Sequence, residues 1–143
     1  MGKLKYILLI ICFVFNSTVF ASGISVEIDS KNIEFDVQPI IENSRTLVPM
    51  RKIFEELGCE VEWLSENQTV IATKNSKIIA LQIGKNKIIS TDIETDESTV
   101  TEIDTAPVIR DGRTLVPVRV ISESLGCNVE WDGDSQTVII KTK

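Results

Sequence analysis

Histidine is absent from the sequence of 143 residues, and tyrosine occurs once, at Tyr6. The chain therefore has no side chain that ordinarily titrates near neutral pH, and it lacks the commonest ligand of protein metal sites. Tyr6 and Cys12 lie in an N-terminal apolar run, so the rest of the chain has no precursor of a tyrosine-derived cofactor. The sequence also lacks a Gly-x-Ser-x-Gly motif. We therefore expect no catalytic residue, no cofactor, no metal site and no enzymatic activity.

Positive charge is scarce as well. Of the 15 Lys and Arg residues, Lys3 and Lys5 lie near the N-terminus, which leaves 13 against 21 Asp and Glu residues and a net charge of −8. Proteins that bind nucleic acid or anionic membrane surfaces usually present a basic stripe. This sequence has no such stripe, so we expect neither of these partners.

The first 21 residues predict a secretory signal peptide. Two lysines precede an apolar run over residues 6–15, and the small residue Ala21 suits cleavage by a signal peptidase. The run is too short for a transmembrane span, although an uncleaved anchor is an alternative. We expect residues 22–143 to be secreted, either extracellular or at the cell surface, with no membrane association after cleavage.

The chain repeats itself at a spacing of 68 residues. The motif Arg-Thr-Leu-Val-Pro-x-Arg occupies residues 45–51 and 113–119, and both copies are followed by Leu-Gly-Cys, Val-Glu-Trp and Gln-Thr-Val-Ile. Such self-similarity indicates a repeated structural unit. We expect units at about residues 24–74 and 92–142, joined by strands within residues 77–90. No linker rich in Gly, Ser or Pro separates them, so we expect one domain beyond the signal peptide.

The residue pattern of each unit predicts strands around one short helix. Apolar and polar residues alternate over most of the unit, whereas Met50, Ile53 and Leu57 follow the spacing of one helix face. Pro49 suits the start of this helix and Gly58 a left-handed end. A helix this short is unstable alone in water and must pack on other elements. We therefore expect an α+β fold, in which two tandem strand–strand–helix–hairpin units form an antiparallel sheet packed on short helices.

Two cysteines and two tryptophans recur at equivalent positions. Cys59 and Cys127 either form a disulfide or each fill a small buried slot as a compact apolar residue. A disulfide requires that both lie near the axis that relates the two units. Trp63 and Trp131 either stack on a ligand from an exposed position or cover the core beside the helix.

The arginines of the motif also have two interpretations. Arg51 lies four residues before Glu55, a spacing that suits an ion pair on a helix surface, and the second unit repeats this spacing. Arg45 either lays its stem over apolar surface or joins Arg51 in an anion site near the start of the helix.

The doubled motif with its Leu-Gly-Cys, Val-Glu-Trp and Gln-Thr-Val-Ile segments resembles the copper amine oxidase N-terminal domain-like family, also called stalk domains. Ser44 replaces the family's usual glycine, and Leu64 replaces the aspartate that Asp132 retains. The cysteines take the usual alanine position. The resemblance implies an α+β fold, placement outside the cell or on its surface, mostly in Gram-positive bacteria, and no established chemistry. The copper ligands and the quinone of the oxidases belong to a separate catalytic domain.

We expect a secreted, non-catalytic module of the cell envelope that acts as a stalk or binds an unknown envelope protein or glycan. The alternative is a glycan- or peptidoglycan-binding module that uses exposed Trp63 and Trp131. A hydrolase and a binder of small ligands or metals are further alternatives. In the expected case the shared motif serves only to bury a short helix against strands. Convergence of Arg45, Glu55 and Trp63, or of their counterparts, on an open cleft would contradict this interpretation.

Overall fold

The computed structural model describes residues 23–143, so the expected signal peptide over residues 1–21 lies outside the described residues. The helices are α1 (Met50–Glu56) and α2 (Val118–Ser124). The strands are β1 (Ser25–Ile28), β2 (Lys31–Asn32), β3 (Ile40–Glu42), β4 (Arg45–Pro49), β5 (Glu60–Leu64), β6 (Thr69–Lys74), β7 (Lys77–Gln82), β8 (Lys87–Asp92), β9 (Glu97–Glu102), β10 (Val108–Arg110), β11 (Arg113–Pro117), β12 (Asn128–Asp132) and β13 (Thr137–Lys141).

Five consecutive elements recur at the spacing of the sequence motif. The series β3, β4, α1, β5 and β6 returns 68 residues later as β10, β11, α2, β12 and β13. Each helix begins directly after the proline of the motif. Gly58 and Gly126 follow the helices with φ angles of 82° and 83°, a conformation that glycine adopts without steric cost. The predicted helix starts and glycine ends are therefore confirmed.

The strands form three sheets, with the orders β12-β13-β1-β2, β10-β11-β4-β3 and β5-β6-β7-β8-β9. All pairings are antiparallel except that of β1 with β13, which joins the two ends of the described chain. Asp29, just after β1, reinforces this junction because its carboxylate accepts hydrogen bonds from the backbone N–H of Thr142, at 2.9 Å, and from the Thr142 hydroxyl.

The two halves meet where β4 pairs with β11. Val48 lies opposite Val116, its own counterpart, and Leu47 opposes Pro117 just as Leu115 opposes Pro49. This register is unchanged when the halves are exchanged, so a local twofold axis passes between the two valines. Both valines are fully buried. The contact between the halves is therefore part of the core.

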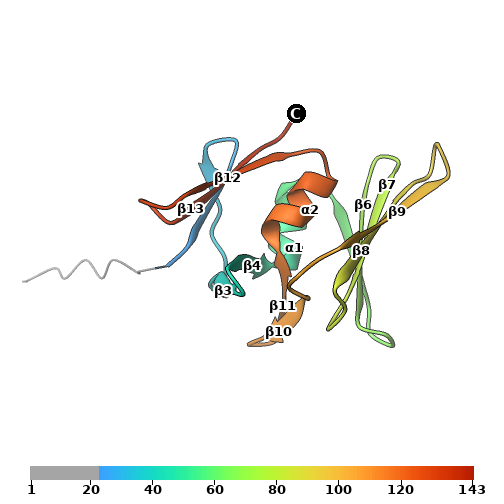
Figure 1. Ribbon diagram of the computed structural model, residues 1–143, viewed down its shortest axis with the longest axis horizontal. Coiled ribbons are helices and arrows are strands. Elements are labelled where there is room, and N and C mark those ends of the chain that lie inside the picture. Colours follow the sequence, from blue (N-terminus) through green and yellow to red (C-terminus); the bar gives the residue numbers. More distant parts are fainter. Residues whose placement is uncertain (1–22) are drawn as a thin grey trace, which may run out of the picture.

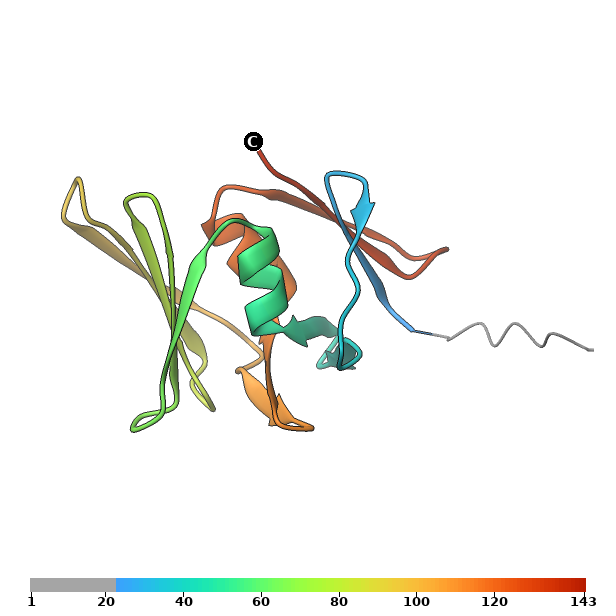
Figure 2. The same cartoon turned by 180° about the vertical axis from the view of Figure 1, so that it is seen from behind.

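Figures 1 and 2 show the helices between two sheets. The sheet containing β12 and β13 lies on one side, the five-stranded sheet lies on the other, and the third sheet lies at the helix starts. One cluster of buried residues unites these layers. It includes Phe54 and Ile121 from the helices, Leu81 from the five-stranded sheet, Val26 from the first sheet and Val48 from the third. The core is therefore shared by all three sheets.

The prediction of an α+β fold with an antiparallel sheet packed on short helices is wrong. Among residues 23–143, strands hold 50% of the residues and helices 12%, so this is a β-rich fold of three sheets. The reason is length: each helix has seven residues and spans only about 10 Å, whereas a six-residue strand spans about 20 Å. Helices of this size fill the space between sheets and cannot cover one.

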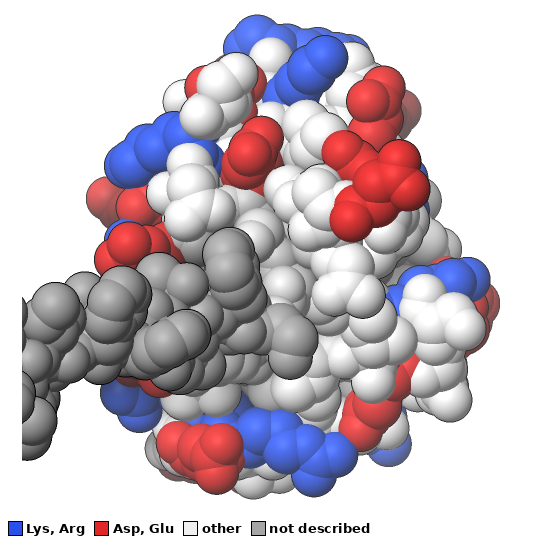
Figure 3. All heavy atoms as spheres, turned by 90° about the vertical axis from the view of Figure 1, so that its left-hand side faces the viewer, with Lys and Arg blue, Asp and Glu red and all other residues white. Residues whose placement is uncertain are grey.

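Figure 3 shows the face that carries the sheet of β12 and β13. Where the described residues are visible in this view, basic and acidic side chains are intermixed around an uncharged centre, without a continuous basic surface. Within residues 23–143, no helix is long and apolar enough to cross a membrane.

Candidate functional site

A groove with a volume of about 810 Å³ lies between α1, β5 and the β10–β11 hairpin. We call it the Trp63 groove. Its lining residues are Glu34, Asp36, Pro49, Met50, Arg51, Lys52, Glu55, Trp63, Ile109, Gly112, Arg113 and Thr114. The last four belong to the second half of the chain. Neither half therefore builds this groove alone.

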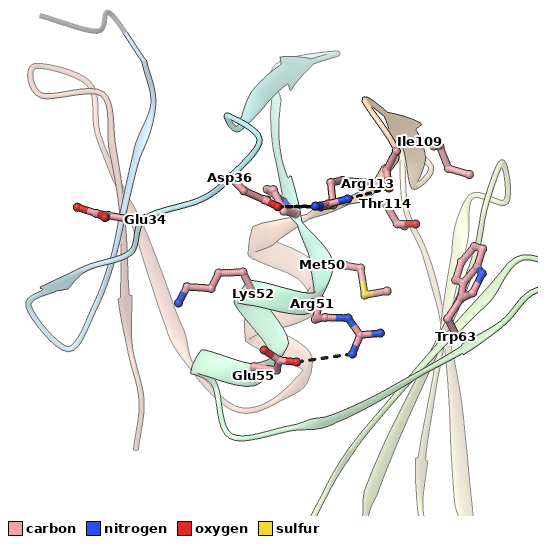
Figure 4. Close-up of a pocket in the computed structure, with 12 residues that line it drawn as sticks. Glu34, Asp36, Met50, Arg51, Lys52, Glu55, Trp63, Ile109, Arg113 and Thr114 are labelled. Carbon is pink, nitrogen blue, oxygen red and sulfur yellow. Dashed lines mark hydrogen bonds and ion pairs between the residues drawn. The ribbon is translucent and has the colours of Figure 1, made fainter.

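Local structure sets the direction of the lining side chains. Along β5 the exposed positions alternate with half-buried ones, and Trp63 is among the half-buried positions that pack against the core. In Figure 4, Met50 and Arg51 point from α1 toward the side on which Trp63 lies, whereas Lys52 and Glu34 point the other way. The part of the groove beside Trp63 therefore combines an indole, a thioether and a guanidinium group.

The charges of the Trp63 groove are balanced. Arg113 donates to Asp36 Oδ2 from Nε at 2.9 Å and from Nη2 at 2.7 Å, and these bonds lower the pKa of Asp36. Arg51 Nη1 lies 3.6 Å from Glu55 Oε1, which realises the predicted spacing of four residues. With Glu34 and Lys52, the lining holds three carboxylates and three cations. Such a surface provides many hydrogen-bonding groups but no excess charge.

A second, smaller groove of about 470 Å³ repeats this design. We call it the Arg45 groove. It is lined by Arg45, Thr46, Glu102, Ile103, Asp104, Pro117, Arg119, Val120 and Glu123. All except Ile103 are 68-residue counterparts of residues that line the Trp63 groove. Arg45 Nη2 lies 2.7 Å from Asp104 Oδ2, as Arg113 does from Asp36. The two grooves are thus related by the local twofold axis.

Residues of the shared motif from both halves converge on the Trp63 groove. Glu55, Trp63 and Arg113, the counterpart of Arg45, line the same groove. This convergence contradicts the interpretation that the residues common to both halves serve only to pack a helix on strands.

The two tryptophans occupy different environments. Trp63 is half-buried in the groove, whereas Trp131 on β12 is 43% exposed and lines neither groove. A ligand-binding role stays a prediction for both residues, but only Trp63 lies in a concave site.

Cys59 and Cys127 are free, buried thiols. The N–H group of Cys59 donates to the carbonyl of Phe54 at 2.8 Å, and that of Cys127 donates to the carbonyl of Ser122 at 2.9 Å, so each cysteine closes the end of its helix. Burial raises the pKa of both thiols. These positions agree with a compact apolar role, and the alternative disulfide stays a prediction.

Sequence reasoning missed the ion pairs that join the two halves. Asp36 and Asp104 recur at the same spacing as Arg45 and Arg113, and this recurrence was the available signal. A further pair joins counterparts directly, with Arg110 Nη2 2.8 Å from Glu42 Oε1. Among the described residues, no group of three or more Asp, Glu or Cys side chains is arranged to hold a metal ion.

Comparison with known proteins gives one family match. The profile of the copper amine oxidase N-terminal domain matches residues 27–140, which is nearly the whole described chain. No curated protein matches the sequence.

Proposed function

The chain belongs to the copper amine oxidase N-terminal domain family, and from this premise we propose that it is a secreted interaction module of a Gram-positive cell envelope. The domain that defines the family is a non-catalytic module. In this proposal the signal peptide over residues 1–21 directs secretion, and a partner binds in the Trp63 groove. The observation that carries the proposal is the lining of that groove by residues of the repeated motif from both halves.

An open groove distinguishes this proposal from a purely structural stalk. A stalk requires a stable core and a solvated surface, and it gains nothing from a half-exposed indole beside buried Met50. Concave sites with apolar floors and a few polar groups are the usual places where ligands bind. We therefore infer that the protein contributes recognition as well as spacing.

A glycan is a second candidate for the partner, and Trp63 favours it. An indole offers a flat apolar face beside a polar edge, which suits a sugar ring. The balanced charges of the groove suit an uncharged polymer rich in hydroxyl groups, because such a ligand forms hydrogen bonds without breaking the Asp36–Arg113 pair. A polyanion or a polycation would meet repulsive charges in the same groove.

Retention of the purified protein on isolated Gram-positive cell walls tests the proposal. We expect Trp63→Ala to weaken retention about tenfold or more, as is typical when a central aromatic anchor is removed. Trp131→Ala, which alters the matching residue outside the groove, should leave retention unchanged. Because Trp63 also contacts the core, Arg51→Ala provides a second variant whose side chain is 59% exposed, and it should weaken retention without loss of stability.

Treatment of the walls before the assay separates the two partners. A protein partner predicts that protease treatment abolishes retention, whereas a glycan partner predicts that retention survives protease and is lost after muramidase digestion. Equal loss with Trp63→Ala and Trp131→Ala, or no retention by the unaltered protein, would contradict a site in the Trp63 groove. Turnover of wall polymers by the purified protein would contradict the non-catalytic assignment.

A further inference from the structure

The strand β9 forms an open edge of the five-stranded sheet. All six residues of Glu97–Glu102 are exposed, and no strand of residues 23–143 lies beyond it. Its pairing with β8 runs without interruption from Glu97, opposite Asp92, to Glu102, opposite Lys87. Proteins usually protect such edges with proline, lysine, bulges or short strands. β9 has none of these features, and charge protects only its two ends.

The charged residues that face one another across β7, β8 and β9 leave acidic side chains at the open edge. One row of facing residues runs from Lys77 on β7 through Asp92 on β8 to Glu97 on β9. Like charges that face each other destabilise a strand pair, and opposite charges stabilise it. The row therefore ends on a carboxylate whose neighbour is also acidic. At the other end of β9, Glu102 faces Lys87 on β8 and is open on its other side. A sixth strand with a cation at each end would offset the acidic pair of Asp92 and Glu97, and it would continue the alternation of charge that Lys87 and Glu102 begin.

The centre of β9 continues an apolar row on the sheet face opposite the core. Val100 lies opposite Ile89, which lies opposite Ala80, which lies opposite Ile71. The last three are half-buried, whereas Val100 is 58% exposed. An apolar residue facing Val100 from an added strand would extend this row and cover its exposed end.

We propose that β9 is a docking edge for an extended, basic segment of another protein, which binds as a sixth, antiparallel strand. The facing positions define the segment: a lysine or arginine opposite Glu102, an apolar residue opposite Val100, and a second lysine or arginine opposite Glu97. Read from its N-terminus, the segment is basic-x-apolar-x-x-basic. Backbone hydrogen bonds would supply affinity, and these three side chains would supply specificity.

The same geometry disfavours a second copy of this chain as the occupant. Two β9 strands paired antiparallel about their centres would place Glu97 of each copy opposite Glu102 of the other. Both contacts would join like charges, which is unfavourable in a sheet. The edge therefore favours a basic partner over self-association.

Titration of the labelled protein with short peptides tests the proposal by amide NMR. The probe is Lys-Thr-Ile-Thr-Thr-Lys with blocked ends, and the matched control has glutamate in place of the last lysine. We expect saturable shifts of the β9 amides with the probe, and binding that is roughly threefold to tenfold weaker with the control.

A charge exchange makes the test independent of any general effect on folding. Glu97 lines neither groove and is exposed, so Glu97→Lys should leave the spectrum of the free protein otherwise unchanged. This variant should bind the control peptide better than the original probe, which reverses the preference of the unaltered protein. Equal binding of both peptides by both proteins would overturn the proposal. So would shifts centred on β5, the other edge of the sheet, an absence of saturable shifts at millimolar peptide, or dimers of the free protein joined through β9.

Discussion

Ser122 is the buried polar side chain whose replacement is expected to stabilise the protein. It is fully buried in α2, and among the described side chains its hydroxyl oxygen is the buried polar atom without a hydrogen-bond partner. It stands at the position that Phe54 occupies in α1. Burial of an unpaired hydroxyl costs about 1–3 kcal/mol, and alanine also has a higher helix propensity by up to about 0.7 kcal/mol. We expect Ser122→Ala to stabilise the protein by about 1–2 kcal/mol, after allowing for the contacts that the oxygen loses.

Ser124 provides the matched control in the same helix. Its hydroxyl donates to the carbonyl of Val120 at 2.7 Å, and the residue is half-buried. Ser124→Ala gains the same helix propensity but loses a hydrogen bond worth about 0.5–1.5 kcal/mol. We therefore expect Ser124→Ala to lie within about 1 kcal/mol of the unaltered protein. The difference between the two variants isolates the unpaired hydroxyl.

Urea unfolding followed by tryptophan fluorescence measures both variants. A gain of about 1–2 kcal/mol raises the urea midpoint by about 0.5–1 M for a domain of this size. A lower midpoint for Ser122→Ala than for the unaltered protein would refute the reasoning. Equal midpoints for the two variants would also refute it, because the hydroxyl of Ser122 would then have no cost.

Two further predictions concern titratable groups. Burial raises the pKa of the Cys59 and Cys127 thiols. The free energy of unfolding that the buried neutral thiols contribute is therefore fully present below the ordinary thiol pKa, and it is lost as the pH rises through the raised pKa of each thiol. Both thiols should react with an alkylating reagent, detected by mass spectrometry, only after addition of urea, and rapid labelling of the native protein would contradict their burial. Hydrogen bonds from Thr142 lower the pKa of Asp29, so the stability that this carboxylate provides is present above the ordinary aspartate pKa and is lost as the pH falls through the lowered value. Asp29→Asn should therefore lower the urea midpoint at neutral pH and reduce its further fall in acid, and an unchanged midpoint at neutral pH would contradict the role of this junction.

Local signals in the sequence predicted local structure well. Pro49 marks the start of α1, which begins at the next residue, and Gly58 marks its end because it adopts a positive φ. Both effects act within a few residues, so the sequence alone is sufficient to locate them. The spacing of Arg51 and Glu55 is another local signal, and it led correctly to an ion pair on the helix surface.

The fold class and the groove depend on contacts between distant residues. Nothing near Ser25 indicates that β1 will pair in parallel with β13 at the other end of the chain. The convergence of Trp63 and Arg113 likewise depends on how β4 meets β11, and the facing of Val48 and Val116 becomes evident only in the assembled sheet. The clear helical periodicity of each unit also led to the prediction of an α+β fold. Each helix has only seven residues, which is too few to cover a sheet.

The claim that both halves build one binding groove is tested most directly by exchanging the charges of Asp36 and Arg113. Retention on isolated cell walls is measured for Arg113→Asp alone and for the double variant Asp36→Arg with Arg113→Asp. The single variant should bind weakly because two carboxylates then face each other across the halves, and the double variant should regain most of the lost retention because the pair is restored in reverse. A double variant that binds no better than the single one would contradict the claim.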